Sequence, residues 1–159
     1  MTKYLVKNKE ELQEIIKTNS KPLNSLDVSN ITDMSFLFFN ISNISNVTYF
    51  DIDSWDTSNV TNMNSIFRSC TSLKEIPLLN TSNVSDMSGF FCNCSSLTTI
   101  PLLDISSVST MYCLFYGCSS LPLLDKVLFL DKSINAFKRQ IYLQMSQEQL
   151  QQTYVNLVI

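Results

Sequence analysis

The sequence repeats itself through its middle with a period of 24 residues. Met63, Met87 and Met111 are each 24 residues apart, and Met34 lies 29 residues before Met63, so the first unit carries a five-residue insertion. One such unit is too short to bury a hydrophobic core alone, whereas neighbouring units can cover each other's apolar edges. The repeat therefore predicts that equivalent side chains of four successive units lie in continuous interior rows.

Within each unit, the spacing predicts a short helix and then a strand. Apolar residues lie three before and four after each methionine, which is the spacing of one helical face. A Thr or Ser two residues before the methionine suits an N-cap, and an Asn, Ser or Gly six residues after it suits a helix end. Leu73-x-x-Ile76-x-Leu78 and Leu97-x-x-Ile100-x-Leu102 follow, with inward apolar and outward positions that predict strands.

The sequence thus predicts an α/β solenoid, a short leucine-rich repeat stack with one parallel strand and one short helix per unit of about 24 residues and helical caps at both ends. Residues 1–25 are expected to form an N-terminal capping helix and a degenerate first strand. Residues 26–125 would form the four units, and residues 126–159 a C-terminal helical cap. Asn8 is a candidate N-cap for the first helix, and Ser146-Gln147-Glu148-Gln149 is a capping-box pattern that opens the last one.

A resemblance supports this interpretation. The pattern D-x-S-N-V-T-x-M-x-x-x-F-x-x-C-x-S-L, which runs from Asp56 to Leu73, resembles the BspA-type leucine-rich repeats of bacterial surface proteins. Lys9-Glu10-Glu11-Leu12 resembles the helix that often precedes such repeats. The similarity covers residues 8–125. It implies a leucine-rich repeat fold, adhesion to host or matrix proteins, and a surface or secreted location.

The cysteines follow the repeat. Cys70, Cys94 and Cys118 each lie seven residues after a methionine, at a position where the first unit has isoleucine, while Cys92 and Cys113 belong to other columns. A position that holds cysteine in three units and isoleucine in the fourth is typical of an apolar environment. A metal site needs ligands that converge on one point, whereas a column of thiols forms a line, and the Cβ vectors of neighbouring thiols would run parallel rather than toward a disulfide. We therefore predict buried free thiols, no metal and no cofactor.

Catalysis is not indicated. The chain has no histidine, which excludes Ser–His and Cys–His catalysis and His-ligated zinc, and no acidic pair lies in a catalytic motif. Asp51, Asp53 and Asp56 could suggest calcium, but they lack the glycine of an EF-hand loop, and a polar turn is the favoured interpretation. We predict that the protein is not an enzyme.

Charge and hydropathy argue against two further classes of protein, those that bind nucleic acid and those that span a membrane. Residues 26–125 contain two basic and nine acidic residues, which makes a poor surface for phosphates and argues against nucleic acid. No segment has the apolar length of a membrane span, and the first residues show no signal-peptide pattern, so a cytoplasmic location stays open beside the surface one. The sequence leaves the oligomeric state open.

What remains is a binding face on the outward strand positions, where repeat proteins usually engage their partners. We predict a noncatalytic leucine-rich repeat module that binds a protein or glycan through this face. The alternative is a structural or assembly protein that self-associates through its terminal helices, with the tail Gln147–Gln152 docking on another subunit. The candidate partner-binding residues are Ser45, Asn46, Thr48, Lys74, Glu75, Thr98 and Thr99.

Overall fold

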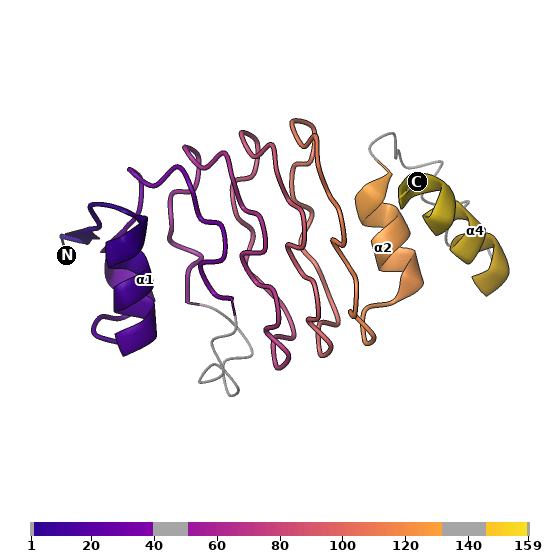
Figure 1. Cartoon of the computed structure of the whole chain (residues 1–159), viewed down its shortest axis with the longest axis horizontal. Helices are drawn as coiled ribbons and strands as arrows, with labels where there is room; N and C mark the ends of the chain where they lie inside the picture. Colours follow the sequence, from indigo (N-terminus) through magenta and orange to yellow (C-terminus); the bar gives the residue numbers. More distant parts are fainter. Residues whose placement is uncertain (1, 40–50, 132–145, 159) are drawn as a thin grey trace.

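The computed structural model describes residues 2–39, 51–131 and 146–158. Its elements in chain order are β1 (Tyr4–Leu5), α1 (Lys9–Thr18), the short 3₁₀ helix η1 (Leu23–Ser25), β2 (Leu26–Asp27), α2 (Leu123–Leu130) and α4 (Gln147–Val158). Irregular coils that lie side by side separate the N-terminal elements from α2 and α4 (Figure 1). The helices therefore sit at the two ends of a body that is itself neither helix nor sheet.

Helix α1 closes the N-terminal end. The Asn8 Oδ1 accepts a hydrogen bond from the Glu11 N–H at 2.9 Å, and the apolar face with Leu12 and Ile15 is buried. Lys9 reaches the first coil, where its Nζ lies 3.0 Å from the Asp33 Oδ2. The predicted capping helix is confirmed. The degenerate strand expected near residue 25 is η1 followed by β2, which pairs in parallel with β1.

Helices α2 and α4 pack together at the C-terminal end, where Val127 and Leu150 share a small core. The predicted capping box is confirmed, since the Ser146 N–H donates to the Gln149 Oε1 at 2.8 Å and the Gln149 N–H donates to the Ser146 Oγ at 3.3 Å. In the fourth unit, Leu121-x-x-Leu124 begins the same spacing that predicted strands in the second and third units, but that prediction is wrong here because the chain enters α2. Residues 132–145 of the predicted C-terminal cap lie outside the described residues.

Backbone hydrogen bonds join each coil to the next. In each of the first three coils, three N–H groups donate to carbonyls of the following coil: those of the methionine and of the residues two and four positions after it. In the second and third coils, the N–H of the residue six positions after the methionine makes a fourth such bond. From the third coil to the fourth, these bonds are Met87 N to Thr110 O at 2.9 Å, Gly89 N to Tyr112 O at 2.7 Å, Phe91 N to Leu114 O at 3.1 Å and Asn93 N to Tyr116 O at 2.6 Å. The donors all point toward the C-terminal end.

The prediction of an α/β solenoid of leucine-rich repeats is wrong. The described residues contain two strands of two residues each and three α-helices, none of them at the unit helices and strands that the spacing predicted. The segments expected to be helical are turns, because the residue two after each methionine adopts a left-handed backbone that an α-helix does not accommodate. The φ values are 57° at Phe36, 54° at Ser65, 64° at Gly89 and 56° at Cys113.

The predicted N-caps and strands fail for related reasons. Thr61, Ser85 and Ser109 cap no helix; their hydroxyls donate to carbonyls of the preceding coil. In the predicted strands, Pro77 and Pro101 have no N–H to donate to a ladder.

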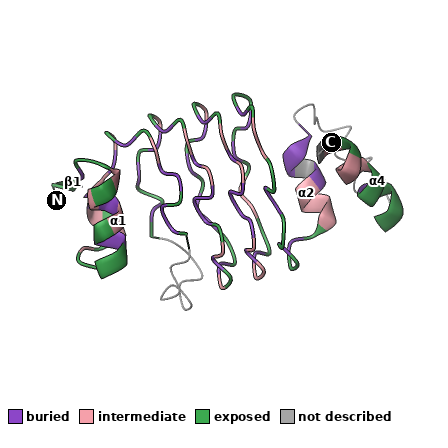
Figure 2. Cartoon of the chain, viewed as in Figure 1, coloured by how far each residue is buried: buried purple, intermediate pink, exposed green. Residues whose placement is uncertain are grey.

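The interior rows are present nevertheless. The rings of Phe38, Phe67, Phe91 and Phe115 lie with centroids 5.4, 6.1 and 6.0 Å apart and are nearly parallel, with interplanar angles of 6°, 11° and 9°. Phe129 of α2 closes the row edge-on against Phe115 at 5.5 Å. The predicted row of equivalent phenylalanines is thus confirmed, and the buried residues lie along the inside of the coils (Figure 2).

The cysteines form a second row. Cys70, Cys94 and Cys118 are buried free thiols, and each Sγ donates to the carbonyl of a phenylalanine in the preceding coil, at 3.3, 3.0 and 3.0 Å. The prediction of buried free thiols is confirmed for these three residues. The hydrogen bond adds a role that apolar packing does not provide, because isoleucine could not satisfy that carbonyl. Burial raises the pKa of Cys70 to about 12 and that of Cys118 to about 11.

The phenylalanine row predicts a large loss of stability on truncation. Phe91 is fully buried between Phe67 and Phe115, so Phe91→Ala should lower the free energy of unfolding by about 3–5 kcal/mol. Thr99 is exposed, and Thr99→Ala should change it by no more than about 0.5 kcal/mol. Urea unfolding of both variants measures the difference. If the two variants lost equal free energy of unfolding, the phenylalanine row would not be a main source of core stability.

The thiol row predicts selective reactivity. Cys113 is exposed whereas the other four cysteines are buried, so one of the five thiols should react rapidly with an aromatic disulfide reagent at pH 8, and Cys113→Ser should remove that phase. Rapid reaction of a second thiol would contradict the packing.

The same thiols predict how stability depends on pH. The native state keeps the protons of Cys70 and Cys118 above the ordinary thiol pKa of 9.0, where the unfolded chain releases them. The contribution of these two thiols to the free energy of unfolding should therefore be constant below about pH 9 and fall as the pH rises toward 11–12. Replacing Cys70 by Ala should flatten that fall, and an unchanged slope would contradict the assignment. Urea titrations at several pH values measure it.

Candidate functional site

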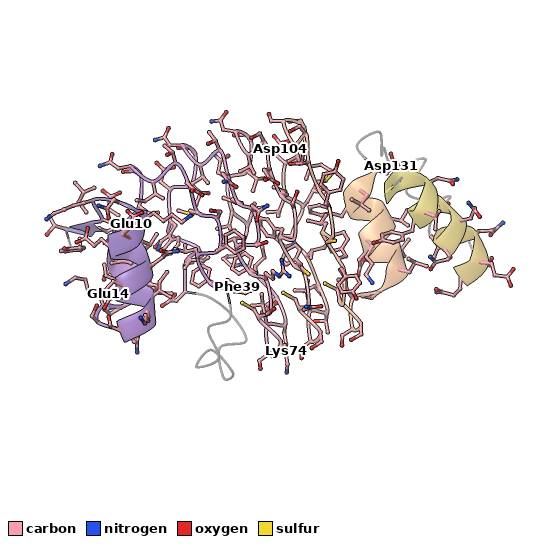
Figure 3. All side chains as sticks on the ribbon, in the orientation of Figure 1. Glu10, Glu14, Phe39, Lys74, Asp104 and Asp131 are labelled. Carbon is pink, nitrogen blue, oxygen red and sulfur yellow. The ribbon has the colours of Figure 1, made fainter. Side chains whose placement is uncertain are left out.

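The described members of the predicted face do lie on the surface. Lys74, Glu75, Thr98 and Thr99 are all exposed. Ser45, Asn46 and Thr48 lie outside the described residues. Figure 3 shows Lys74 at one edge of the coils and Asp104 at the opposite edge.

Two leucines extend this face, and the sequence pattern had placed them in the core. Leu78 and Leu102 are 66% and 80% exposed, whereas the following residues Leu79 and Leu103 are buried. The expected L-x-x-L-x-L register is therefore wrong at its last position. The signal was in the sequence, because adjacent leucines in an extended chain must point to opposite sides.

The backbone beneath these side chains is fixed by neighbouring coils. The Thr98 N–H and Oγ1 both donate to the Lys74 carbonyl, at 3.0 and 3.2 Å. A proline precedes each exposed leucine and limits its backbone freedom. We call this surface the leucine face; its residues are Lys74, Glu75, Leu78, Thr98, Thr99 and Leu102.

The opposite edge is polar and internally satisfied. Asp56 and Asp104 each accept the N–H of the serine two residues later, at 3.0 and 2.9 Å, and hydrogen bonds from that serine lower the pKa of both carboxyls. Asn83 donates from its Nδ2 to the Ser58 carbonyl of the preceding coil at 2.7 Å. These groups shape turns and tie coils together.

The candidate calcium residues behave in the same way. The Asp51 carboxylate accepts a hydrogen bond from the Asn24 Nδ2 at 2.8 Å, while Asp56 accepts from Ser58. Across residues 2–39, 51–131 and 146–158, no group of three or more His, Cys, Asp or Glu side chains could hold a metal ion. The absence of an enzymatic role stays a prediction.

The tail proposed for assembly exposes polar side chains. Gln147, Glu148, Gln151 and Gln152 of α4 face solvent, and the Gln152 Nε2 donates to the Asn156 Oδ1 at 3.0 Å. None of the described helices has the length and apolar character needed to cross a membrane.

Comparison with known proteins replaces the resemblance inferred from the motif. No curated protein and no solved structure matches the chain. A family model matches residues 6–124, and no leucine-rich repeat family is detected. The similarity to BspA-type surface repeats is therefore wrong, and the surface location and adhesion that it implied lose their basis. The family model covers most of the chain. The chain therefore belongs to the family described as "Mycoplasma protein of unknown function, DUF285".

Proposed function

We propose that the chain is a noncatalytic module that binds a partner protein through the leucine face. The observation that carries this proposal is the pair of leucines at equivalent positions of neighbouring coils, exposed at 66% and 80% although the chain has a core in which to bury them. Scattered exposed leucines are ordinary, whereas a repeated pair on a rigid edge offers a partner one continuous apolar contact.

The chemistry of the leucine face favours a protein over a glycan. Leu78 and Leu102 carry no hydrogen-bonding group, and burying each against an apolar pocket would contribute roughly 1.5–3 kcal/mol. Lys74 and Glu75, four and three residues before Leu78, are exposed and can orient a partner through charges of both signs. Because inter-coil hydrogen bonds already hold the backbone, little ordering is needed on binding.

Self-association through the terminal helices has less support. The exposed positions of α4 are amides and a carboxylate, and the apolar side chains Leu150 and Tyr154 already pack against α2.

The double variant Leu78→Asp/Leu102→Asp tests the proposal. The immobilised wild-type chain and the variant are each incubated with an extract of cells that produce the protein, and the retained proteins are quantified by mass spectrometry. We expect a set of proteins that wild type retains and the variant loses by at least about tenfold, since each substitution removes an apolar contact and adds an unpaired charge. Both changed side chains are exposed, so the melting temperature should stay nearly constant.

Leu5→Asp is the matched control. Leu5 is 49% exposed and lies in β1 at the N-terminal end, on a different surface, so this variant should retain the same proteins as wild type. If all retained proteins survive the double variant, or if only glycans on an array discriminate between the two chains, the assignment to protein binding fails.

A further inference from the structure

The coils end on a row of unused backbone donors. In the fourth coil, the N–H groups of Met111, Cys113, Phe115 and Gly117 occupy the positions whose counterparts in the second and third coils all donate to the next coil. In the described part of the chain these four groups have no acceptor.

The fourth coil keeps the backbone geometry that aims these donors. Cys113 has a φ of 56°, close to the 64° of Gly89, and Gly117 has a φ of 74°, close to the 62° of Asn93. Bonds from the third coil to the carbonyls of Thr110, Tyr112, Leu114 and Tyr116 hold the other side of the same backbone. The four free N–H groups therefore point away from the third coil, toward the C-terminal end.

A cavity lies where a fifth coil would be. It has a volume of about 470 Å³, and the backbone from Ser109 to Tyr116 forms one wall, while Leu130, Tyr154 and Leu157 form the other. The lining contains no charged residue. Tyr112 and Tyr116 at its rim are 77% and 67% exposed. This space is thus open, mostly apolar, and bordered by a row of hydrogen-bond donors.

The neighbouring helices cannot supply the missing acceptors. Helix α2 covers part of the fourth coil through the contact of Phe129 with Phe115, but its backbone carbonyls are largely used within the helix. It contributes side chains to the wall and leaves the donors unpaired.

We propose that this edge docks a backbone segment of a different, partner protein, whose carbonyls accept from Met111, Cys113, Phe115 and Gly117. The preceding coils show which acceptor these donors take, since at each equivalent position it is a backbone carbonyl of a parallel segment. The uncharged lining selects a segment with apolar or small side chains. The site is separate from the leucine face.

A second copy of this chain does not fit. Two copies joined by this edge would place N–H groups against N–H groups. A head-to-tail arrangement would need the carbonyl side of the first coil, which α1 covers with Leu12, Ile15 and the Lys9 contact to Asp33. The occupant is therefore a chain with a free row of carbonyls.

Amide hydrogen exchange of the full chain, followed by NMR, tests this assignment. In the free chain, the amides of Met111, Cys113, Phe115 and Gly117 should exchange much faster than those of Met87, Gly89, Phe91 and Asn93. The probe is a synthetic peptide with the sequence of residues 80–97 and serine at both cysteine positions, because its carbonyls at Asp86, Ser88, Phe90 and Cys92 already serve this role for the second coil. At millimolar concentration it should slow exchange of the four edge amides by at least about tenfold.

A scrambled peptide and two variants complete the test. Tyr116→Asp should abolish the peptide's effect by placing a charge at the rim, whereas Leu102→Asp on the leucine face should leave it unchanged, so this proposal and the proposed function fail separately. Slow exchange of the four amides in the free chain, or no slowing by the peptide, would overturn the assignment. Protection that grows with the concentration of the chain itself would show that the occupant is a second copy, which also overturns it.

Discussion

The structure depends on a one-way row of backbone hydrogen bonds. In each of the first three coils, alternate N–H groups from the methionine onward donate to carbonyls of the next coil, in the same direction. Buried peptide groups without partners are costly, so this constraint sets the spacing between coils and fixes which side chains meet. Along this row, the acceptors face the end that α1 covers and the donors face the end with α2 and α4.

Other hydrogen bonds run in the opposite direction, from backbone and side-chain donors alike. The Ser85 N–H and hydroxyl both donate to the Thr61 carbonyl of the preceding coil, and the Cys94 thiol donates to the Phe67 carbonyl. Among the residues that the structure describes, no buried side-chain nitrogen or oxygen lacks a partner. A body with almost no regular secondary structure can therefore satisfy its buried polar side chains, provided that small donors recur at the period of the repeat.

The sequence was informative about periodicity and misleading about conformation. Equal spacing of Phe67, Phe91 and Phe115 predicted a row, because any chain that repeats its path places equivalent side chains together. The same spacing could not distinguish a helix from successive turns, since both place residues three and four apart on one side. The decisive feature was a left-handed backbone at residues as different as Phe36 and Gly89, which residue identity does not announce. The exposed leucines could have been predicted from the Leu78-Leu79 and Leu102-Leu103 doublets.

One departure from the repeat determines the extent of both candidate surfaces. Pro122 occupies the position equivalent to Lys74 and Thr98, and there the chain begins α2 instead of repeating the segment that carries the exposed leucines. The leucine face consequently ends after Leu102. The same change replaces the next coil, which would have offered carbonyls to the fourth, by a helix whose carbonyls are used internally. A repeat that simply continued would have neither an end to its apolar edge nor an open row of donors, so the sites arise where the periodicity stops.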